Sequence, residues 1–165
     1  MAGDVSFDVV SEFDRQELVN ALDQARREIG TRYDFKGSKA EIELGKDEIV
    51  LRADSESRAK SMRDLIESKA IRRGLSLKIF DWGKVEEAGG NTVRQQVGLR
   101  EGLSDELAKR ISKLIRDEFP KAKSQIQGDA IRVSSKSKDE LQKIITRLRE
   151  ESDGFPVALQ FQNYR

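Results

Sequence analysis

Apolar side chains recur along this chain with two periods, every second residue in some stretches and every third or fourth in others. The shorter period predicts strands and the longer one amphipathic helices. In the first half, Asp14 is placed to cap a helix and Gly30 to end it, as Ser55 and Gly74 are for a second. The predicted elements are, in order, a strand over 6–11, a helix over 15–29, a hairpin over 41–51, a helix over 56–73 and a short strand over 77–80.

The second half repeats this order. Ser104 is placed to cap one helix, and Ser137 with Glu140 forms a capping box for another. The predicted elements are a strand over 93–99, a helix over 105–115, a hairpin over 126–133, a helix over 138–148 and a strand over 159–161. The repeat indicates an α+β protein of two tandem ferredoxin-like (βαββαβ) domains, each a four-stranded antiparallel sheet with two helices on one face.

The boundary between the two predicted domains falls in a glycine-rich stretch. Residues 81–91 contain Gly83, Gly89 and Gly90 and are interpreted as a linker, which gives domains over 1–88 and 91–165. The strand over 4–12 has two possible places. It pairs within its own half, or it crosses to the second sheet beside Phe161, and periodicity does not choose between them.

Composition narrows the chemistry. The chain has no Cys and no His, which excludes disulfides and thiolate zinc sites and removes the commonest general base. It also lacks a phosphate-binding loop, a dinucleotide fingerprint and a nucleophile elbow. We therefore expect a binding protein that is not an enzyme and uses neither a cofactor nor a metal. The polar start of the chain and the lack of an apolar run of ~20 residues lead us to expect a cytoplasmic protein.

The formal net charge is only +1, which argues against a protein that simply coats nucleic acid. The halves differ, however. Residues 91–165 contain 15 Lys/Arg and 11 Asp/Glu, against 16 and 19 in residues 1–90. This asymmetry favours an anion-facing second half.

The sheet face turned away from the helices is the first candidate binding surface. In the second predicted domain, the residues that point to this face are Arg94, Gln96, Arg100, Gln125, Gln127 and Arg132. Glutamine offers a donor and an acceptor, while arginine offers a fork for phosphate and a flat face for a base. The alternative is an ordinary solvated strand face.

Two further segments combine aromatic and cationic residues. The first contains Arg32, Tyr33, Phe35, Lys36 and Gly37. Here we expect the aromatic rings to stack on a base and the cations to bind phosphate. In the alternative interpretation, Tyr33 and Phe35 are core residues. The second is the C-terminal Gln160–Arg165, with Asn163 and Arg165, although the aromatic-glycine signature of RNA-recognition sheets is absent.

Several segments together resemble the YajQ family of bacterial nucleotide-binding proteins. They are Ser6–Asp14, Thr31–Ser38, Gln125–Val133, Lys136–Gln142 and Leu159–Arg165, in the family's order. The resemblance implies two ferredoxin-like domains and a nucleotide- or RNA-binding role without established catalysis. Some members are regarded as cyclic-dinucleotide effectors that act on transcription.

Three functions follow as expectations. The first is a nucleotide-binding protein that senses a cyclic dinucleotide, GTP or ATP. The second is a protein that binds tRNA or another RNA. The third is an adaptor that docks a transcription regulator, with no membrane partner in any of the three.

Overall fold

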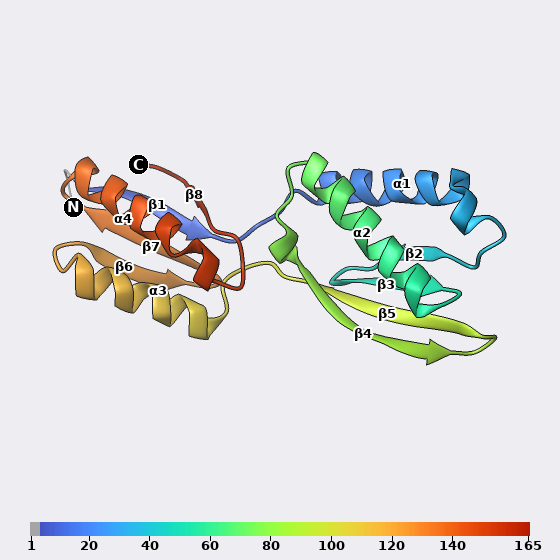
Figure 1. The fold of residues 1–165 in the computed structure, drawn as a ribbon. Helices are drawn as coiled ribbons and strands as arrows, with labels where there is room; N and C mark the ends of the chain where they lie inside the picture. Colours follow the sequence, from blue (N-terminus) through green and yellow to red (C-terminus); the bar gives the residue numbers. More distant parts are fainter. Residues whose placement is uncertain (1–3) are drawn as a thin grey trace. The chain divides into compact units, whose positions relative to one another are not determined.

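The computed structural model describes residues 4–165, which form two compact units (Figure 1). The middle unit is Phe13–Arg100. The terminal unit combines the described residues up to Glu12 with Glu101–Arg165. The chain therefore passes from one unit to the other twice.

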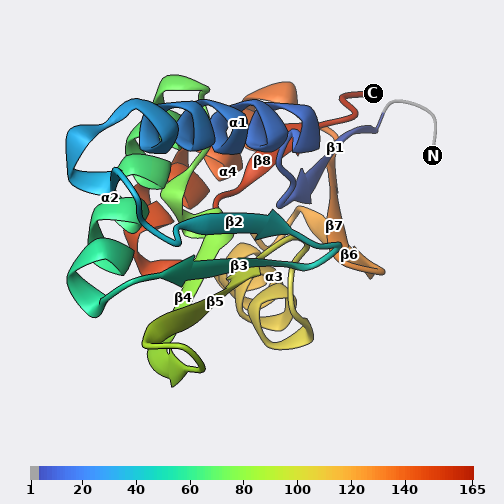
Figure 2. The ribbon, with the colours of Figure 1, turned by 90° about the vertical axis from the view of Figure 1, so that its right-hand side faces the viewer.

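The middle unit is one antiparallel sheet with two helices and its own core. Its strands run in the order β2-β3-β5-β4, and the β4–β5 hairpin is its longest pair (Figure 2). The elements are α1 (Arg15–Thr31), the 3-10 turn η1 (Tyr33–Phe35), β2 (Glu41–Leu44), β3 (Glu48–Ala53), α2 (Glu56–Arg72), η2 (Leu77–Ile79), β4 (Phe80–Ala88) and β5 (Thr92–Leu99).

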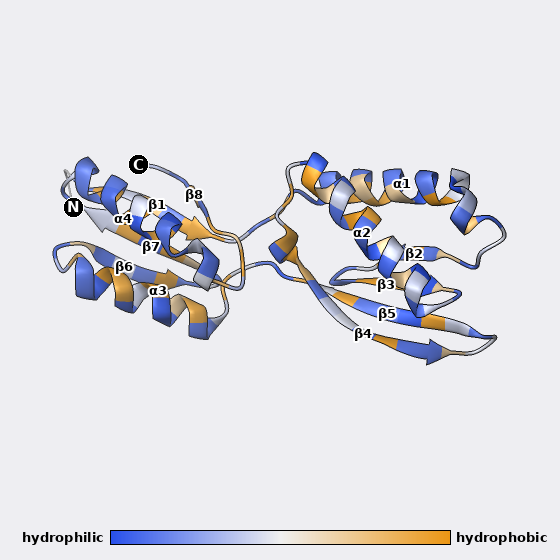
Figure 3. Cartoon of the chain, viewed as in Figure 1, coloured by the Kyte–Doolittle hydropathy of each residue, from blue (hydrophilic) through white to orange (hydrophobic). Residues whose placement is uncertain are grey.

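The terminal unit has the same construction, with the sheet order β6-β7-β1-β8. Its elements are β1 (Val5–Val10), α3 (Asp105–Glu118), β6 (Lys123–Gln127), β7 (Ala130–Ser135), α4 (Lys138–Glu150), η3 (Ser152–Gly154) and β8 (Gln160–Gln162). Its edge strand β6 is mostly hydrophilic, with Ile126 as the one hydrophobic residue (Figure 3). Phe7, Ile131 and Val133 are fully buried in its core with residues of α3 and α4.

Two ferredoxin-like units, as the repeat predicts, are confirmed, although each reaches the fold by a different order along the chain. In the terminal unit, β1, α3, β6, β7, α4 and β8 follow the βαββαβ order, and the middle unit is inserted after β1. In the middle unit, β5 occupies the place of the first strand but comes last in sequence. The middle unit is therefore a circular permutation of the same plan.

The expected boundary between domains 1–88 and 91–165 differs from the division that the structure shows. Residues 81–91 are not a linker. They belong to β4 and the turn of a hairpin in which Ala88 pairs with Thr92. Gly90 and Asn91 have φ angles of 71° and 59°, the left-handed conformation that a tight hairpin turn requires. The strand over 93–99 thus completes the first sheet and does not begin the second.

The N-terminal strand takes the second of its two possible places. β1 lies between β7 and β8, with Phe7 opposite Val133 and Val9 opposite Phe161. With β5, the middle sheet already has four strands, whereas the terminal sheet would have only three strands without β1.

Local sequence signals set the helix starts as predicted. The Asp14 carboxylate accepts hydrogen bonds from the amides of Gln16 and Glu17, and the Ser104 hydroxyl accepts one from Leu107. The capping box at α4 is only half formed. Ser137 accepts from the Glu140 amide, but the Glu140 carboxylate accepts from Ser135 instead of from the Ser137 amide. One further prediction is wrong, since residues 77–79 form the 3-10 turn η2 and the strand begins at Phe80.

Candidate functional site

The predicted site residues fall on three surfaces of the two units. Arg32, Tyr33, Phe35, Lys36 and Gly37 lie after α1 in the middle unit. Arg94 and Gln96 lie on β5, in the sheet of that same unit. The terminal unit contains the other five, which are Gln125, Gln127, Arg132, Asn163 and Arg165.

The segment after α1 divides into structural and exposed residues. Phe35 is only 3% exposed and packs in the core, with the guanidinium groups of Arg32 and Arg58 over its ring. Arg32 donates two hydrogen bonds to Asp34, of 2.9 and 2.7 Å. Tyr33 is 89% exposed, so the interpretation of both aromatics as core residues is wrong for Tyr33. Of the five predicted residues, Tyr33, Lys36 and Gly37 are exposed and remain open to a ligand.

The open face of the middle sheet mixes charges of both signs. Cross-strand partners point to the same face, so Glu41, Arg52, Arg94 and Glu86 form a row across the four strands. Gln96 donates a 3.4 Å hydrogen bond to Glu48 on the neighbouring strand. Carboxylates at both ends of the row weaken the attraction of this face for a phosphate.

The open face of the terminal sheet carries a different row. Gln125, Arg132, Asp8 and Gln162 are consecutive cross-strand partners on β6, β7, β1 and β8. The neighbouring row begins with Lys123, Ser134 and Ser6. Gln127 lies beside Gln125 and donates a 3.4 Å hydrogen bond to it. Ile126, which alternates with Gln125 and Gln127 along β6, remains 41% exposed on the edge strand.

Asp8 organises the centre of this face. The residue is only 8% exposed. Its carboxylate accepts hydrogen bonds from Arg132, at 3.0 and 3.4 Å, and from Asn163, at 2.9 Å. Asn163 has a φ of 58°, and the chain bulges there before Arg165 and Ser6 exchange backbone hydrogen bonds. Both C-terminal residues of the predicted site therefore lie beside Asp8.

The hydrogen bonds from Arg132 hold the pKa of the Asp8 carboxyl below its ordinary value of 3.8. Burial opposes this shift, and the hydrogen bond from Asn163 adds to it. Because the folded pKa is lower than the unfolded one, the ionised carboxylate stabilises the fold above about pH 3.8, and this stabilisation is lost as the pH falls through the folded value.

We expect Asp8→Asn to lower the free energy of unfolding of the terminal unit most at neutral pH, where wild-type Asp8 is ionised. The difference between wild type and variant should shrink as the pH falls below 3.8. Denaturant unfolding over this pH range measures it. A difference that is constant with pH would show that the amide, not the lost charge, causes the effect.

Two cavities adjoin at the β6 edge of the terminal sheet. The first, the β6–β7 cavity, has a volume of about 470 Å³ and is lined by Arg116, Ala122, Lys123, Ser124, Gln125, Arg132 and Ser134. The second, the lysine cavity, has a volume of about 480 Å³ and is lined by Asp4, Lys121, Lys123, Ser134, Ser135, Lys136, Ser137 and Glu140. Lys123 and Ser134 belong to both. Five cations thus border the pair, and the β6–β7 cavity has no carboxylate in its lining.

The charge difference between residues 1–90 and 91–165 does not persist when charges are counted for the two units of the structure. The terminal unit contains 13 Lys/Arg and 14 Asp/Glu over residues 1–12 and 101–165, while the middle unit contains 18 and 16. The three acids Asp4, Asp8 and Glu12 join the terminal unit, and Arg94 and Arg100 leave it. The attraction for an anion is therefore local to the two cavities and not a property of a whole unit.

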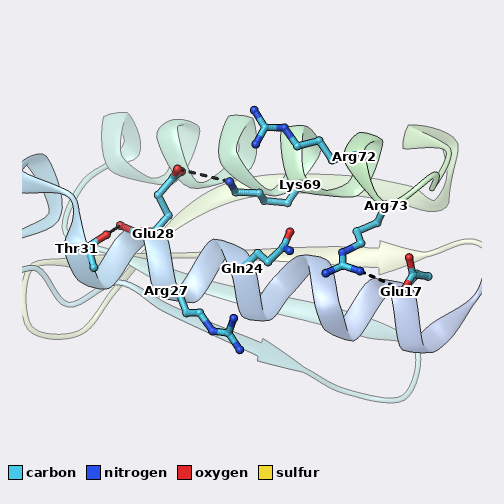
Figure 4. A pocket seen from close by; sticks show the side chains of 8 residues that line it. All are labelled: Glu17, Gln24, Arg27, Glu28, Thr31, Lys69, Arg72 and Arg73. Carbon is cyan, nitrogen blue, oxygen red and sulfur yellow. Dashed lines mark hydrogen bonds and ion pairs between the residues drawn. The ribbon is translucent and has the colours of Figure 1, made fainter.

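A third hollow lies between α1 and α2 in the middle unit (Figure 4). Its volume is about 700 Å³, and its lining residues are Glu17, Gln24, Arg27, Glu28, Thr31, Lys69, Arg72 and Arg73. Lys69 pairs with Glu28 at 3.5 Å and Arg73 with Glu17 at 3.6 Å. The other two guanidinium groups, of Arg27 and Arg72, point to opposite edges of the groove (Figure 4). Because two of its four cations are paired with carboxylates, the groove attracts an anion less strongly than the terminal cavities do.

Sequence reasoning missed the lysines. Lys123 has the same strand alternation as Gln125 and Gln127, but the strand was predicted from Ile126 onward, which left Lys123 outside it. Lys121 lies in the connection before β6 and Lys136 in the connection after β7. Arg116 lies on helix α3, where the sequence predicts no site residue, and it lines the β6–β7 cavity.

Within residues 4–165, no group of three or more His, Cys, Asp or Glu side chains is arranged to bind a metal ion. In the same range, no helix has the length and apolar character needed to cross a membrane.

Comparison with known proteins decides the family. The family model of YajQ-like nucleotide-binding proteins matches residues 5–165. The chain belongs to this family. A nucleotide-binding protein of Trichodesmium erythraeum is 58% identical over 165 residues, and one of Chloroflexus aggregans is 56% identical. A nucleotide-binding protein of Roseiflexus castenholzii is 52% identical, and each of the three alignments covers all of both chains.

Membership of the YajQ-like family confirms the resemblance that the five segments show. It also makes a nucleotide the class of ligand with which the open face of the terminal sheet is compared. A nucleotide needs cations for phosphate and planar or hydrogen-bonding groups for its base. The lining of the β6–β7 cavity contains three cations, Arg116, Lys123 and Arg132, and the Gln125 amide.

Proposed function

We propose that this member of the YajQ-like family binds GTP, ATP or a cyclic dinucleotide over the β6–β7 end of the terminal sheet, and that it binds without catalysing a reaction. The base lies against the open face near Gln125, and phosphate meets Lys123, Arg116 and the free edge of Arg132. Binding is saturable and places the protein among cytoplasmic nucleotide sensors.

The observation that carries this proposal is the pair of adjoining cavities that share Lys123 and Ser134. Asp8 strengthens it, because the two hydrogen bonds to Arg132 fix the guanidinium plane and leave its remaining N–H groups available. A planar donor held in place loses little conformational freedom when a ligand binds.

Titration calorimetry with GTP, ATP and a cyclic dinucleotide tests the site. We expect Gln125→Ala to weaken binding roughly two- to tenfold, the value of one hydrogen bond of about 0.5–1.5 kcal/mol. Gln96→Ala is the matched control, because Gln96 occupies the open face of the other sheet. Equal losses in both variants, or no binding of any nucleotide by wild type, would refute the proposed site.

RNA is the second candidate ligand, and the groove between α1 and α2 is the observation that favours it. Arg27 and Arg72 have no ion pair among the described residues, and they lie at the two edges of the groove (Figure 4). A bound RNA would contact several phosphates, so its affinity would fall steeply with salt. Repeating the binding measurement with tRNA at two salt concentrations separates this ligand from a mononucleotide.

A further inference from the structure

The lysine cavity has a composition that the nucleotide site alone does not explain. Lys121, Lys123 and Lys136 come from three different segments, before β6, on β6 and after β7, yet they border one space of about 480 Å³. None of the three has an ion pair among residues 4–165. Three ammonium groups that form no ion pair around one cavity repel one another, and an anion between them removes that repulsion.

The start of α4, where Ser137 lines the cavity, adds donors. Ser137 caps α4 by accepting from the Glu140 amide, so the first-turn amides of Lys138 and Asp139 have no carbonyl partner within the helix. The positive end of the 13-residue helix α4 therefore faces the same region as the lysines.

Two carboxylates also line this cavity. Glu140 is occupied, because it accepts a 2.8 Å hydrogen bond from the Ser135 hydroxyl. Asp4 Oδ1 is buried without a hydrogen-bond partner among the described residues. Three cations against two carboxylates leave a net positive cavity. Lysine acts as a point charge, so it favours a doubly charged terminal phosphate over a singly charged diester.

We infer that the lysine cavity binds the terminal phosphate of a linear nucleoside polyphosphate whose nucleoside end lies in the β6–β7 cavity. The inference rests on the function proposed above and narrows its ligand class. Lys123, which borders both cavities, contacts the phosphate chain where it passes from one to the other. A cyclic dinucleotide has no terminal phosphate and gains nothing from Lys121 and Lys136.

The test compares GTP with GMP, so that the affinity ratio isolates the outer phosphates. In wild type, GTP should bind more tightly than GMP. In the double variant Lys121→Gln/Lys136→Gln, GTP affinity should fall roughly tenfold or more, the value of charged hydrogen bonds, while GMP affinity changes less than about twofold. Lys138→Gln is the control, because Lys138 begins α4 beside the cavity but does not line it.

The outcomes separate the two proposals. A GTP-to-GMP ratio that falls equally in the Lys138→Gln control shows diffuse attraction and overturns the lysine cavity. A ratio that the double variant leaves unchanged also overturns it, while the nucleotide site stands. Tighter binding of a cyclic dinucleotide than of GTP, unaffected by the double variant, overturns the ligand class.

If wild type binds none of GMP, GTP, ATP and a cyclic dinucleotide, the proposed function fails, and inorganic pyrophosphate then decides the cavity. Its addition should shift the NMR signals of the Lys138 and Asp139 amides in wild type and not in the double variant. No shift at these amides would overturn the cavity as a phosphate site.

Discussion

Phe7→Ala should unfold the terminal unit while the middle unit stays folded. The Phe7 side chain is fully buried, and its ring contacts those of Phe161 and Tyr164, with centroids 5.8 and 6.2 Å away. Removing a buried phenylalanine ring costs about 3–5 kcal/mol. A loss of this size is a large fraction of the stability of a small domain.

Hydrogen exchange measured along the chain shows which residues lose protection. Because β1 lies between β7 and β8, exchange should accelerate over residues 101–165 and remain slow in the helices and sheet of residues 13–100. Leu22→Ala is the matched control, because Leu22 is equally buried in the core of the middle unit and should give the opposite pattern. Faster exchange over 13–88 in Phe7→Ala would restore the domain division expected from the sequence.

The sequence predicts most of the helices and strands, but not which strands pair in which sheet. Apolar periodicity and the caps at Asp14, Ser104 and Ser137 are local signals, and they identified the four helices and the β2–β3 and β6–β7 hairpins, but not the β4–β5 hairpin. The assignment of strands to sheets depends on long-range pairing, which local patterns do not encode. Phe7 and Val9 fit either core, and Gly89-Gly90-Asn91 suits a flexible linker as well as a tight hairpin turn.

The candidate site shows the same limit. Gln125, Gln127 and Arg132 were predicted from alternation, and the structure places them on one face with Asn163 and Arg165 beside them. Lys121, Lys123 and Lys136 were not predicted, because they come together only when a loop, a strand and a second loop meet in space. Two interpretations of Tyr33 were left open, and the core interpretation is wrong because the 3-10 turn η1 interrupts the alternation that would bury Tyr33 next to Phe35.

Lys123→Ala should reduce GTP affinity roughly 10- to 100-fold, more than any other single substitution at the site. Lys123 lines both cavities, so its ammonium group is the one charge that serves the phosphate chain in each. A charged hydrogen bond is worth about 1.5–3 kcal/mol, which corresponds to this range of affinity. The side chain is exposed on an edge strand, so the melting temperature should stay close to that of wild type.

Lys84→Ala provides the comparison, because Lys84 is also an exposed lysine on an edge strand but lies on β4 of the other sheet. Calorimetry with GTP should detect no change in this control. A similar loss in both variants would mean that GTP responds to the overall charge of the protein, whereas a loss confined to Lys123→Ala places the phosphate chain at the junction of the two cavities. Comparison with Lys121→Gln/Lys136→Gln then separates the contribution of the shared lysine from that of the outer phosphate site. Lys123→Ala should weaken the binding of both GTP and GMP, whereas the double variant should weaken the binding of GTP alone.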